Sequence, residues 1–131
     1  MCIHKILLLA ICGAAGTLAR FGVTGLVHRW YGEPTPIATI AVNGLGCLIF
    51  GLIWGLTEYR FGSSHAISLA LLVGFCGALT TFSSFGFDSH QLAHRSGVFW
   101  MGGYIAAQNI IGIMLLFMGI GMAQFLNGTS P

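Results

Sequence analysis

Long apolar stretches, interrupted by short polar ones, make up almost the whole chain. Four of them contain no Asp, Glu, Lys or Arg, over residues 6–19, 34–57, 61–87 and 96–131. A helix needs about 20 apolar residues to cross the hydrocarbon core of a bilayer. The pattern predicts an all-α membrane protein with four transmembrane helices, at about residues 6–27, 37–56, 66–92 and 98–125. Together they form one transmembrane domain over residues 1–131.

The third apolar stretch is polar in its middle. Gly74 to Phe85 has the sequence GFCGALTTFSSF, which combines hydroxyl side chains, glycines and phenylalanines. Hydroxyl groups can bond to their own backbone and compete with a regular helix, and glycine lowers the cost of unusual backbone angles. An unbroken helix over 66–92 would also span roughly 40 Å, more than a core of about 30 Å. We therefore predict that the third helix is broken near its middle, at residues 77–83.

Polar side chains also occur at membrane depth in the other three helices. Arg20 lies late in the first helix, Thr39 and Asn43 lie in the second, and Tyr104 and Gln108 lie one turn apart in the fourth. A buried side-chain amide costs free energy unless it finds a partner. Asn43 therefore indicates either a hydrogen bond between packed helices or a donor that lines a pathway. Arg20 is either a cation that reaches the membrane surface or part of a mouth that attracts anions.

Small residues recur at helical spacing in the first two helices, which allows close contact between membrane helices. They are Gly13, Gly16 and Ala19 in the first helix, and Gly44, Cys47, Gly51 and Gly55 in the second.

Composition narrows the possible functions. Only 6% of the 131 residues are charged and 56% are hydrophobic, whereas soluble domains average about 25% charged residues. The net charge of +2 forms no basic stripe, so no nucleic-acid partner is expected. The sequence shows no nucleophile–base pair and no phosphate-binding loop, which argues against an enzyme. Asp88, His90 and His94 could be grouped as a metal cluster, but we favour histidines at a membrane edge.

The positive charges give almost no preference for one orientation in the membrane. Four spans put both termini on one side with Lys5 and Arg60, while Arg29 and Arg95 lie on the other side with Arg20 nearby. Orientation normally follows an excess of Lys and Arg on the cytoplasmic side. The chain is therefore predicted to insert both ways up. Two copies in opposite orientations would form an antiparallel homodimer with closed symmetry.

Three classes of function are compatible with these features. A small-ion channel explains polar residues without titratable ones at the membrane midplane. A dual-topology, proton-coupled multidrug exporter has the same size and number of spans. Such exchange needs a titratable group in the membrane, yet the first helix has no Asp or Glu. A membrane scaffold or assembly subunit is the third class.

The polar segment of the third helix resembles a known family. Residues 74–85 are similar to the GFxGGxTTFSTF signature of the Fluc (CrcB) fluoride channels. The similarity extends to GAAGTLAR at residues 13–20, to TIAVN at residues 39–43 and to Tyr104, so that it covers all four spans. It implies a fluoride-selective channel that exports fluoride passively from the cytoplasm. It also implies two pores in an antiparallel, dual-topology homodimer in the bacterial inner (plasma) membrane.

The resemblance implies roles for individual residues. A structural sodium ion (Na+) at the dimer centre would be held by the backbone carbonyls of Gly77 and Thr80. Carbonyls freed by a broken helix suit a hard cation, and the positive edges of phenylalanine rings suit an anion. The implied anion pathway consists of Phe82, Phe85, Asn43, Tyr104, Thr81, Ser83, Thr39, Gln108 and Arg20.

Four positions depart from the pattern of this family. Ala78 and Ala38 replace common glycines, Gln108 stands where serine is frequent, and Gly112 offers no side chain. The carbonyls at positions 77 and 80 are backbone groups, so Ala78 is compatible with the implied cation site. Gln108 and Gly112 change what the fourth helix can offer to the pathway. Asp88 stands where an acidic residue is usual.

Overall fold

The computed structural model of the chain describes residues 3–32, 35–61 and 66–128, with only the backbone for residues 58–61. Arg60, which enters the charge balance above, therefore has no described side chain. The elements are α1 (Ile3–Tyr31), α2 (Pro36–Phe61), α3 (Ala66–Leu69), the π-helical η1 (Ala70–Cys76), α4 (Gly77–Leu79), α5 (Phe82–Ser96) and α6 (Val98–Asn127).

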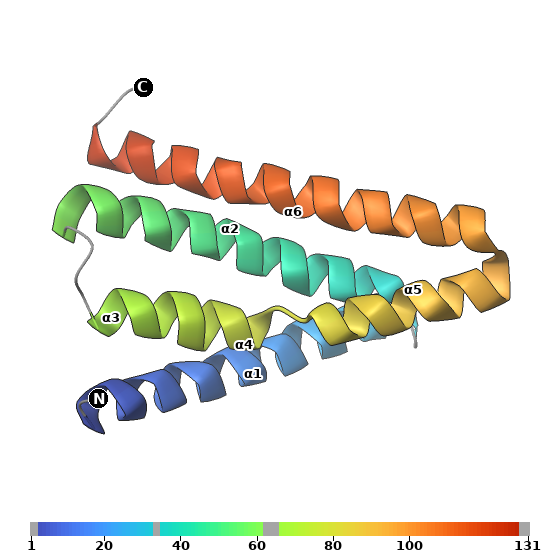
Figure 1. Ribbon diagram of the computed structural model, residues 1–131, viewed down its shortest axis with the longest axis horizontal. Coiled ribbons are helices and arrows are strands. Elements are labelled where there is room, and N and C mark those ends of the chain that lie inside the picture. Colours follow the sequence, from blue (N-terminus) through green and yellow to red (C-terminus); the bar gives the residue numbers. More distant parts are fainter. Residues whose placement is uncertain (1–2, 33–34, 62–65, 129–131) are drawn as a thin grey trace.

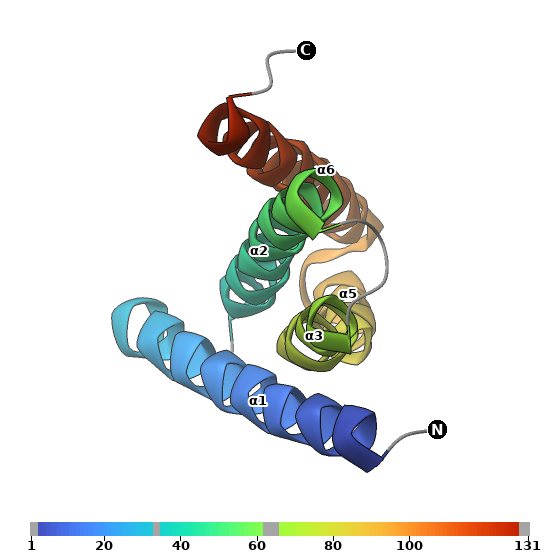
Figure 2. The ribbon, with the colours of Figure 1, turned by 90° about the vertical axis from the view of Figure 1, so that its left-hand side faces the viewer.

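The described elements make four spans that are long and apolar enough to cross a membrane, the third of them assembled from α3, η1, α4 and α5. The prediction of an all-α protein with four such helices and an interrupted third is confirmed. The spans lie side by side along one axis, with α2 between α6 and the third span (Figure 1). The start of α1 and the end of α6 lie at one end of the bundle, and the turn between α5 and α6 lies at the other. Seen along the bundle, α1 crosses the remaining helices on one side (Figure 2).

Glycines bring α2 and α6 into backbone contact, and these two helices form the most extensive interface in the chain. A Cβ atom added to Gly51 would overlap the carbonyl of Leu116, and one added to Gly119 would overlap the carbonyl of Leu48. A Cβ atom at Gly55 would meet Ala123. The small-residue stripe of the second helix therefore faces α6, where small side chains allow the close approach.

Helix α1 packs on the third span through a second set of small residues. A Cβ atom added to Gly16 would overlap the carbonyl of Phe75, and Gly74 lies against the backbone of Leu9. Away from this contact α1 presents large apolar side chains such as Leu18 and Phe21, both exposed. The outer surface of α1 is thus suited to an apolar environment.

Two extended residues interrupt the third span. Thr80 has φ −75° and ψ 156°, and Thr81 has φ −146° and ψ 114°. The Thr80 hydroxyl donates to the carbonyl of Cys76 (3.0 Å), and the backbone N–H of Ser84 donates to Thr81 Oγ1 (3.2 Å). These hydroxyls end α4 and cap α5, as the competition between side chain and helix predicts. The helix before the break is π-helical over Ala70–Cys76, and π-helical segments are frequent at functional sites.

Candidate functional site

Asn43 of α2 holds the break in place through two hydrogen bonds to one residue. The backbone N–H of Thr81 donates to Asn43 Oδ1 (2.7 Å), and Asn43 Nδ2 donates to the carbonyl of Thr81 (3.1 Å). Only 9% of Asn43 and 8% of Thr81 are exposed, and an extended residue offers the donor and the acceptor that a buried amide requires. The hydrogen bond between helices that the sequence allowed is therefore present. The second hydrogen on Nδ2 is not used in this pair.

The carbonyls of Gly77 and Thr80 are among those that lose their helical donors at the break. In a continuous helix the N–H of Thr81 would donate to the carbonyl of Gly77, but here it donates to Asn43. The N–H of Ser84 would donate to the carbonyl of Thr80, but here it donates to Thr81 Oγ1. Gly77 is exposed, and a Cβ atom added to it would meet nothing within 4 Å. Its carbonyl lies in an accessible stretch of backbone.

A cavity of about 350 Å³ lies beside the break, between α2, α5 and α6, and we call it the Phe82 cavity. Phe82 and Phe85 line it with ring centroids 5.4 Å apart and planes inclined by 52°. Phe82 is 83% exposed, so its ring stands out from the chain. Asn43 and Thr81 contribute polar groups to the same cavity. Ring edges and neutral hydrogen-bond donors thus share one space.

Helix α6 contributes Gln108, Asn109 and Gly112 to the Phe82 cavity. Gln108 Oε1 is buried, and it has no hydrogen-bond partner among the described residues. Asn109 donates from Nδ2 to the carbonyl of Ile105 (2.7 Å), so its amide is partly occupied within its own helix. Gln108 is the polar side chain of α6 that is available to a ligand in this cavity.

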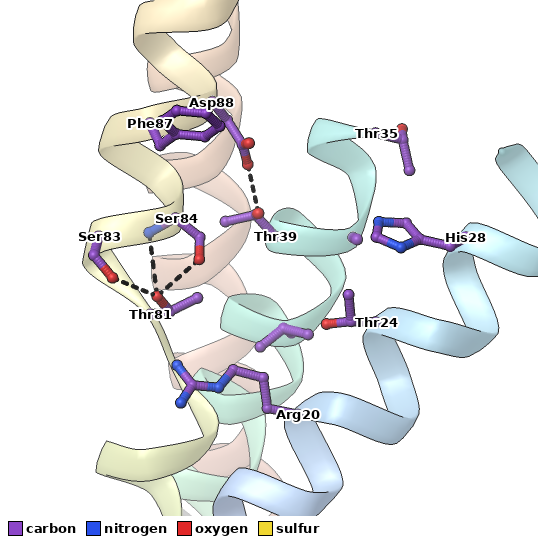
Figure 3. A pocket seen from close by; sticks show the side chains of 12 residues that line it. Arg20, Thr24, His28, Thr35, Thr39, Thr81, Ser83, Ser84, Phe87 and Asp88 are labelled. Carbon is purple, nitrogen blue, oxygen red and sulfur yellow. Dashed lines mark hydrogen bonds between the residues drawn. The ribbon is translucent and has the colours of Figure 1, made fainter. Parts of the chain in front are cut away.

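A second cavity, of about 380 Å³, lies between α1, α2 and α5, and we call it the Arg20 cavity (Figure 3). Arg20, Thr24 and His28 line it from successive turns of α1, at a spacing of four residues. In Figure 3 the Arg20 side chain extends towards the segment that carries Thr81. Thr81 lines both cavities. Thr81, in the break, therefore contributes to the wall of each cavity.

Asp88 ties three helices together on the wall of the Arg20 cavity. Its Oδ2 accepts a hydrogen bond from Thr39 Oγ1 (2.5 Å) and another from the hydroxyl of Tyr104 (3.2 Å). The Tyr104 ring also packs against Phe85, with centroids 5.6 Å apart. Two hydroxyl donors partly satisfy the half-buried carboxylate. Tyr104 thereby links the carboxylate to the phenylalanine pair.

The structure brings the residues implied by the family resemblance into two groups around Thr81. Asn43, Phe82, Phe85 and Gln108 line the Phe82 cavity, and Arg20, Thr39 and Ser83 line the Arg20 cavity. Tyr104 contacts both groups through Phe85 and Asp88. Thr24 and His28 were not singled out from the sequence, although their four-residue spacing from Arg20 indicates a shared helical face.

The three-residue metal cluster considered for Asp88, His90 and His94 does not form. Asp88 bonds to Thr39 and Tyr104, whereas the two histidines contact each other. In the part of the chain that the structure describes, no group of three or more His, Cys, Asp and Glu side chains is placed to hold a metal ion.

Comparison with known proteins places the chain in a family. Residues 7–120 match the family described as "CrcB-like protein, Camphor Resistance (CrcB)". A relative from Nitratidesulfovibrio vulgaris named "Fluoride-specific ion channel FluC" is 41% identical, over 94% of this chain and 99% of its own. Relatives of the same name from Nitrosococcus oceani and Maridesulfovibrio salexigens are 38% and 40% identical, each over 94% of this chain and 98% of its own. The chain is a multi-pass membrane protein of the CrcB-like family.

Proposed function

We propose that this chain is a fluoride-selective ion channel that exports fluoride passively from the cytoplasm across the bacterial inner membrane. The relatives reported above bear the name of a fluoride-specific channel. The observation that carries the proposal is that Thr81, at the break, lines both cavities. One cavity offers ring edges and neutral donors, and the other offers a cation. The name of these relatives, an ion channel, also agrees with the expectation that the chain is not an enzyme.

The Phe82 cavity supplies the chemistry for a dehydrated anion. The edges of Phe82 and Phe85 are the positive parts of the ring quadrupole, and the free Nδ2 hydrogen of Asn43 can donate to an anion. The amide of Gln108 can turn over and offer N–H in place of its buried oxygen. These groups together replace part of a hydration shell without a full positive charge, which lets the anion leave again.

The Arg20 cavity is suited to attract the anion before it enters. In the part of the chain that the structure describes, the Arg20 guanidinium has no hydrogen-bond or ion-pair partner. The nearby Asp88 carboxylate is engaged by the hydroxyls of Thr39 and Tyr104 instead. A cation in a cleft with low-dielectric walls raises the local concentration of anions.

The exposed face around Phe82 supports assembly as an antiparallel homodimer with two pores. Ser83 and Ser84, next to Phe82 at the start of α5, are exposed in the single chain. Their hydroxyls bond to Thr81 Oγ1, but the exposed backbone at Gly77, whose carbonyl has lost its helical donor, would lack a hydrogen-bond partner in lipid. A second copy in the opposite orientation would cover this face and complete the wall of each Phe82 cavity. The weak charge bias of the loops is compatible with such dual topology.

A structural sodium ion between the two copies is the further part of the proposal. The carbonyls of Gly77 and Thr80 fit a hard cation, because their helical donors are diverted to Asn43 and to Thr81 Oγ1. Gly77 is exposed, so a second copy can approach it. Such an ion would neutralise carbonyl dipoles that face each other across the dimer, and it would stabilise the interface.

Fluoride efflux from liposomes that contain the purified chain tests this function. With internal potassium fluoride, efflux should start only when a potassium ionophore is added, because a passive channel moves net charge. A fluoride electrode reports the rate, and chloride-loaded liposomes give the control. Equal chloride and fluoride fluxes would contradict selectivity.

The same assay separates the other candidates. A proton-coupled exporter would respond to an imposed pH gradient, and a scaffold subunit would give no flux. The Phe82 cavity contains no Asp, Glu, His, Lys or Arg among its lining residues, which disfavours the proton-coupled alternative at this place.

A further inference from the structure

Two histidines near the end of α5 form a pair that the proposed channel does not use. His90 and His94 lie one helical turn apart, and both are exposed. Their Nε2 atoms are 3.1 Å apart, and their ring centroids are 4.4 Å apart with planes inclined by 56°. Both rings therefore turn the same nitrogen towards one point on the surface of the helix.

The distance between the two nitrogens matches that of two ligands on one metal ion. Zinc binds histidine nitrogen at about 2.0–2.1 Å. A metal ion at about 2.05 Å from both Nε2 atoms would subtend an angle of roughly 100° with them, given their separation of 3.1 Å. This angle lies between the right angle of square-planar copper or nickel sites and the tetrahedral angle of zinc sites. The proton that the two Nε2 atoms share must leave, or move to Nδ1 of its ring, before both nitrogens can bind the ion.

The surroundings leave this point open to a cation. The nearest basic side chain in the sequence, Arg95, lines a separate small cavity with Asp88 and Pro36. Asp88 is engaged by Thr39 and Tyr104. The structure thus gives neither Arg95 nor Asp88 a contact with the histidine pair. Because His90 and His94 are exposed, water can complete the coordination shell.

We propose that His90 and His94 form a bidentate site for a borderline transition-metal ion such as Cu²⁺, Ni²⁺ or Zn²⁺. Two histidines at positions i and i+4 on one helical face are an established arrangement for binding zinc. Without a metal the two imidazoles share a hydrogen bond, which holds the two Nε2 atoms close together. Such preorganisation lowers the entropic cost of binding. The site is independent of the fluoride pathway.

Copper binding to the tag-free, detergent-solubilised protein tests the site. Cu²⁺ is the most sensitive probe, because it binds most tightly in the divalent series and its electron paramagnetic resonance spectrum reports nitrogen ligands. One equivalent of Cu²⁺ should give a signal with two imidazole nitrogens. Each of the single variants His90→Gln and His94→Gln should lower the affinity for Cu²⁺ by roughly tenfold or more and should remove the two-nitrogen signal.

Two controls keep the result specific. His4→Gln removes an exposed histidine elsewhere on the chain and should leave the signal unchanged. The double variant His94→Gln, Arg95→His keeps the number of histidines but moves the second one off the shared face, so it should lose the two-nitrogen signal. Gel filtration verifies that each variant is folded. Absence of the signal from the unmodified protein, or its survival in either single His→Gln variant, would overturn the proposal.

Discussion

Asn43 and Thr81 bond to each other twice, through the side chain of one and the backbone of the other. The amide of Asn43 thereby bonds to the N–H and the carbonyl of the extended Thr81, as the backbone of a neighbouring β-strand would. This pairing fixes the amide orientation, because the N–H of Thr81 must meet the oxygen. It also diverts the helical donor of the Gly77 carbonyl. One side chain therefore shapes the Phe82 cavity and the proposed cation site together.

Replacing Asn43 should impair conduction and weaken the break. In Asn43→Ala the buried N–H and carbonyl of Thr81 lose their partners, at a cost of about 1–3 kcal/mol. We expect fluoride efflux to fall by roughly tenfold, which corresponds to about 1.4 kcal/mol, while the dimer persists. Thr57→Ala, which removes a hydroxyl bonded within its own helix, is the control and should conduct normally. Unchanged efflux in Asn43→Ala would limit Asn43 to a packing role.

Replacing Phe82 should affect flux much more than folding. Its ring is mostly exposed in the single chain, so Phe82→Ala removes little of the internal core. Loss of a positive ring edge should lower efflux between about two- and tenfold. Phe99→Ala, which removes a ring that is 89% exposed and lines neither the Phe82 nor the Arg20 cavity, is the matched control. Equal rates for the two variants would contradict a role for Phe82 in the pathway.

Neutralising Arg20 should slow efflux in a salt-dependent way. Arg20→Gln removes the cation of the Arg20 cavity. Because this cation attracts anions from solution, we expect the efflux rate at low ionic strength to fall by about two- to fivefold. The difference should shrink near 1 M salt, where the Debye length is about 3 Å. Arg29→Gln removes an exposed charge outside the cavity and should change the rate little. A salt-independent loss would point to a structural role.

Enlarging a glycine in the interface between α2 and α6 should destabilise the fold. Gly51→Ala and Gly119→Ala would each press a methyl group into a backbone carbonyl of the opposite helix. Overpacking of this kind costs about 1–3 kcal/mol, and thermal unfolding in detergent measures it. Gly121→Ala, where a Cβ atom meets nothing within 4 Å, is the control. Equal unfolding temperatures for Gly119→Ala and Gly121→Ala would contradict the backbone contact.

Removal of sodium should weaken the proposed dimer. Carbonyl cages discriminate between cations by size and field strength, so exchange of Na+ for a large organic cation should lower the fraction of dimer at low protein concentration. Cross-linking in detergent measures that fraction. Gly77→Ala keeps the carbonyl, and its Cβ atom meets nothing within 4 Å in the single chain, so it should keep the sodium effect. A dimer fraction independent of sodium would contradict the cation site.

The sequence is enough to predict the spans and the break, because both follow from local chemistry. Apolar runs without charges have the length of a membrane helix, and the hydroxyls of Thr80 and Thr81 compete with helix formation where glycines permit it. The pairing of Asn43 with Thr81 could not be derived in this way. It depends on the register between α2 and the third span, which is set by side-chain fit at Gly46, where a Cβ atom would overlap the Thr80 methyl group. The hydrogen bonds of Asp88 to Thr39 and Tyr104 could not be derived either, because they depend on how α2, α5 and α6 pack together.

The π-helical segment Ala70–Cys76 has a consequence for the direction in which the break faces. Bonding from i to i+5 accommodates about one more residue than an α-helix over the same length. Since each residue of an α-helix turns by about 100°, the chain beyond Cys76 is rotated by roughly that angle about the helix axis. Shortening this segment by one residue would keep every side chain downstream but turn Phe82 and the Gly77 carbonyl to another side. The number of residues in this stretch, as much as their identity, therefore sets the direction of the pathway.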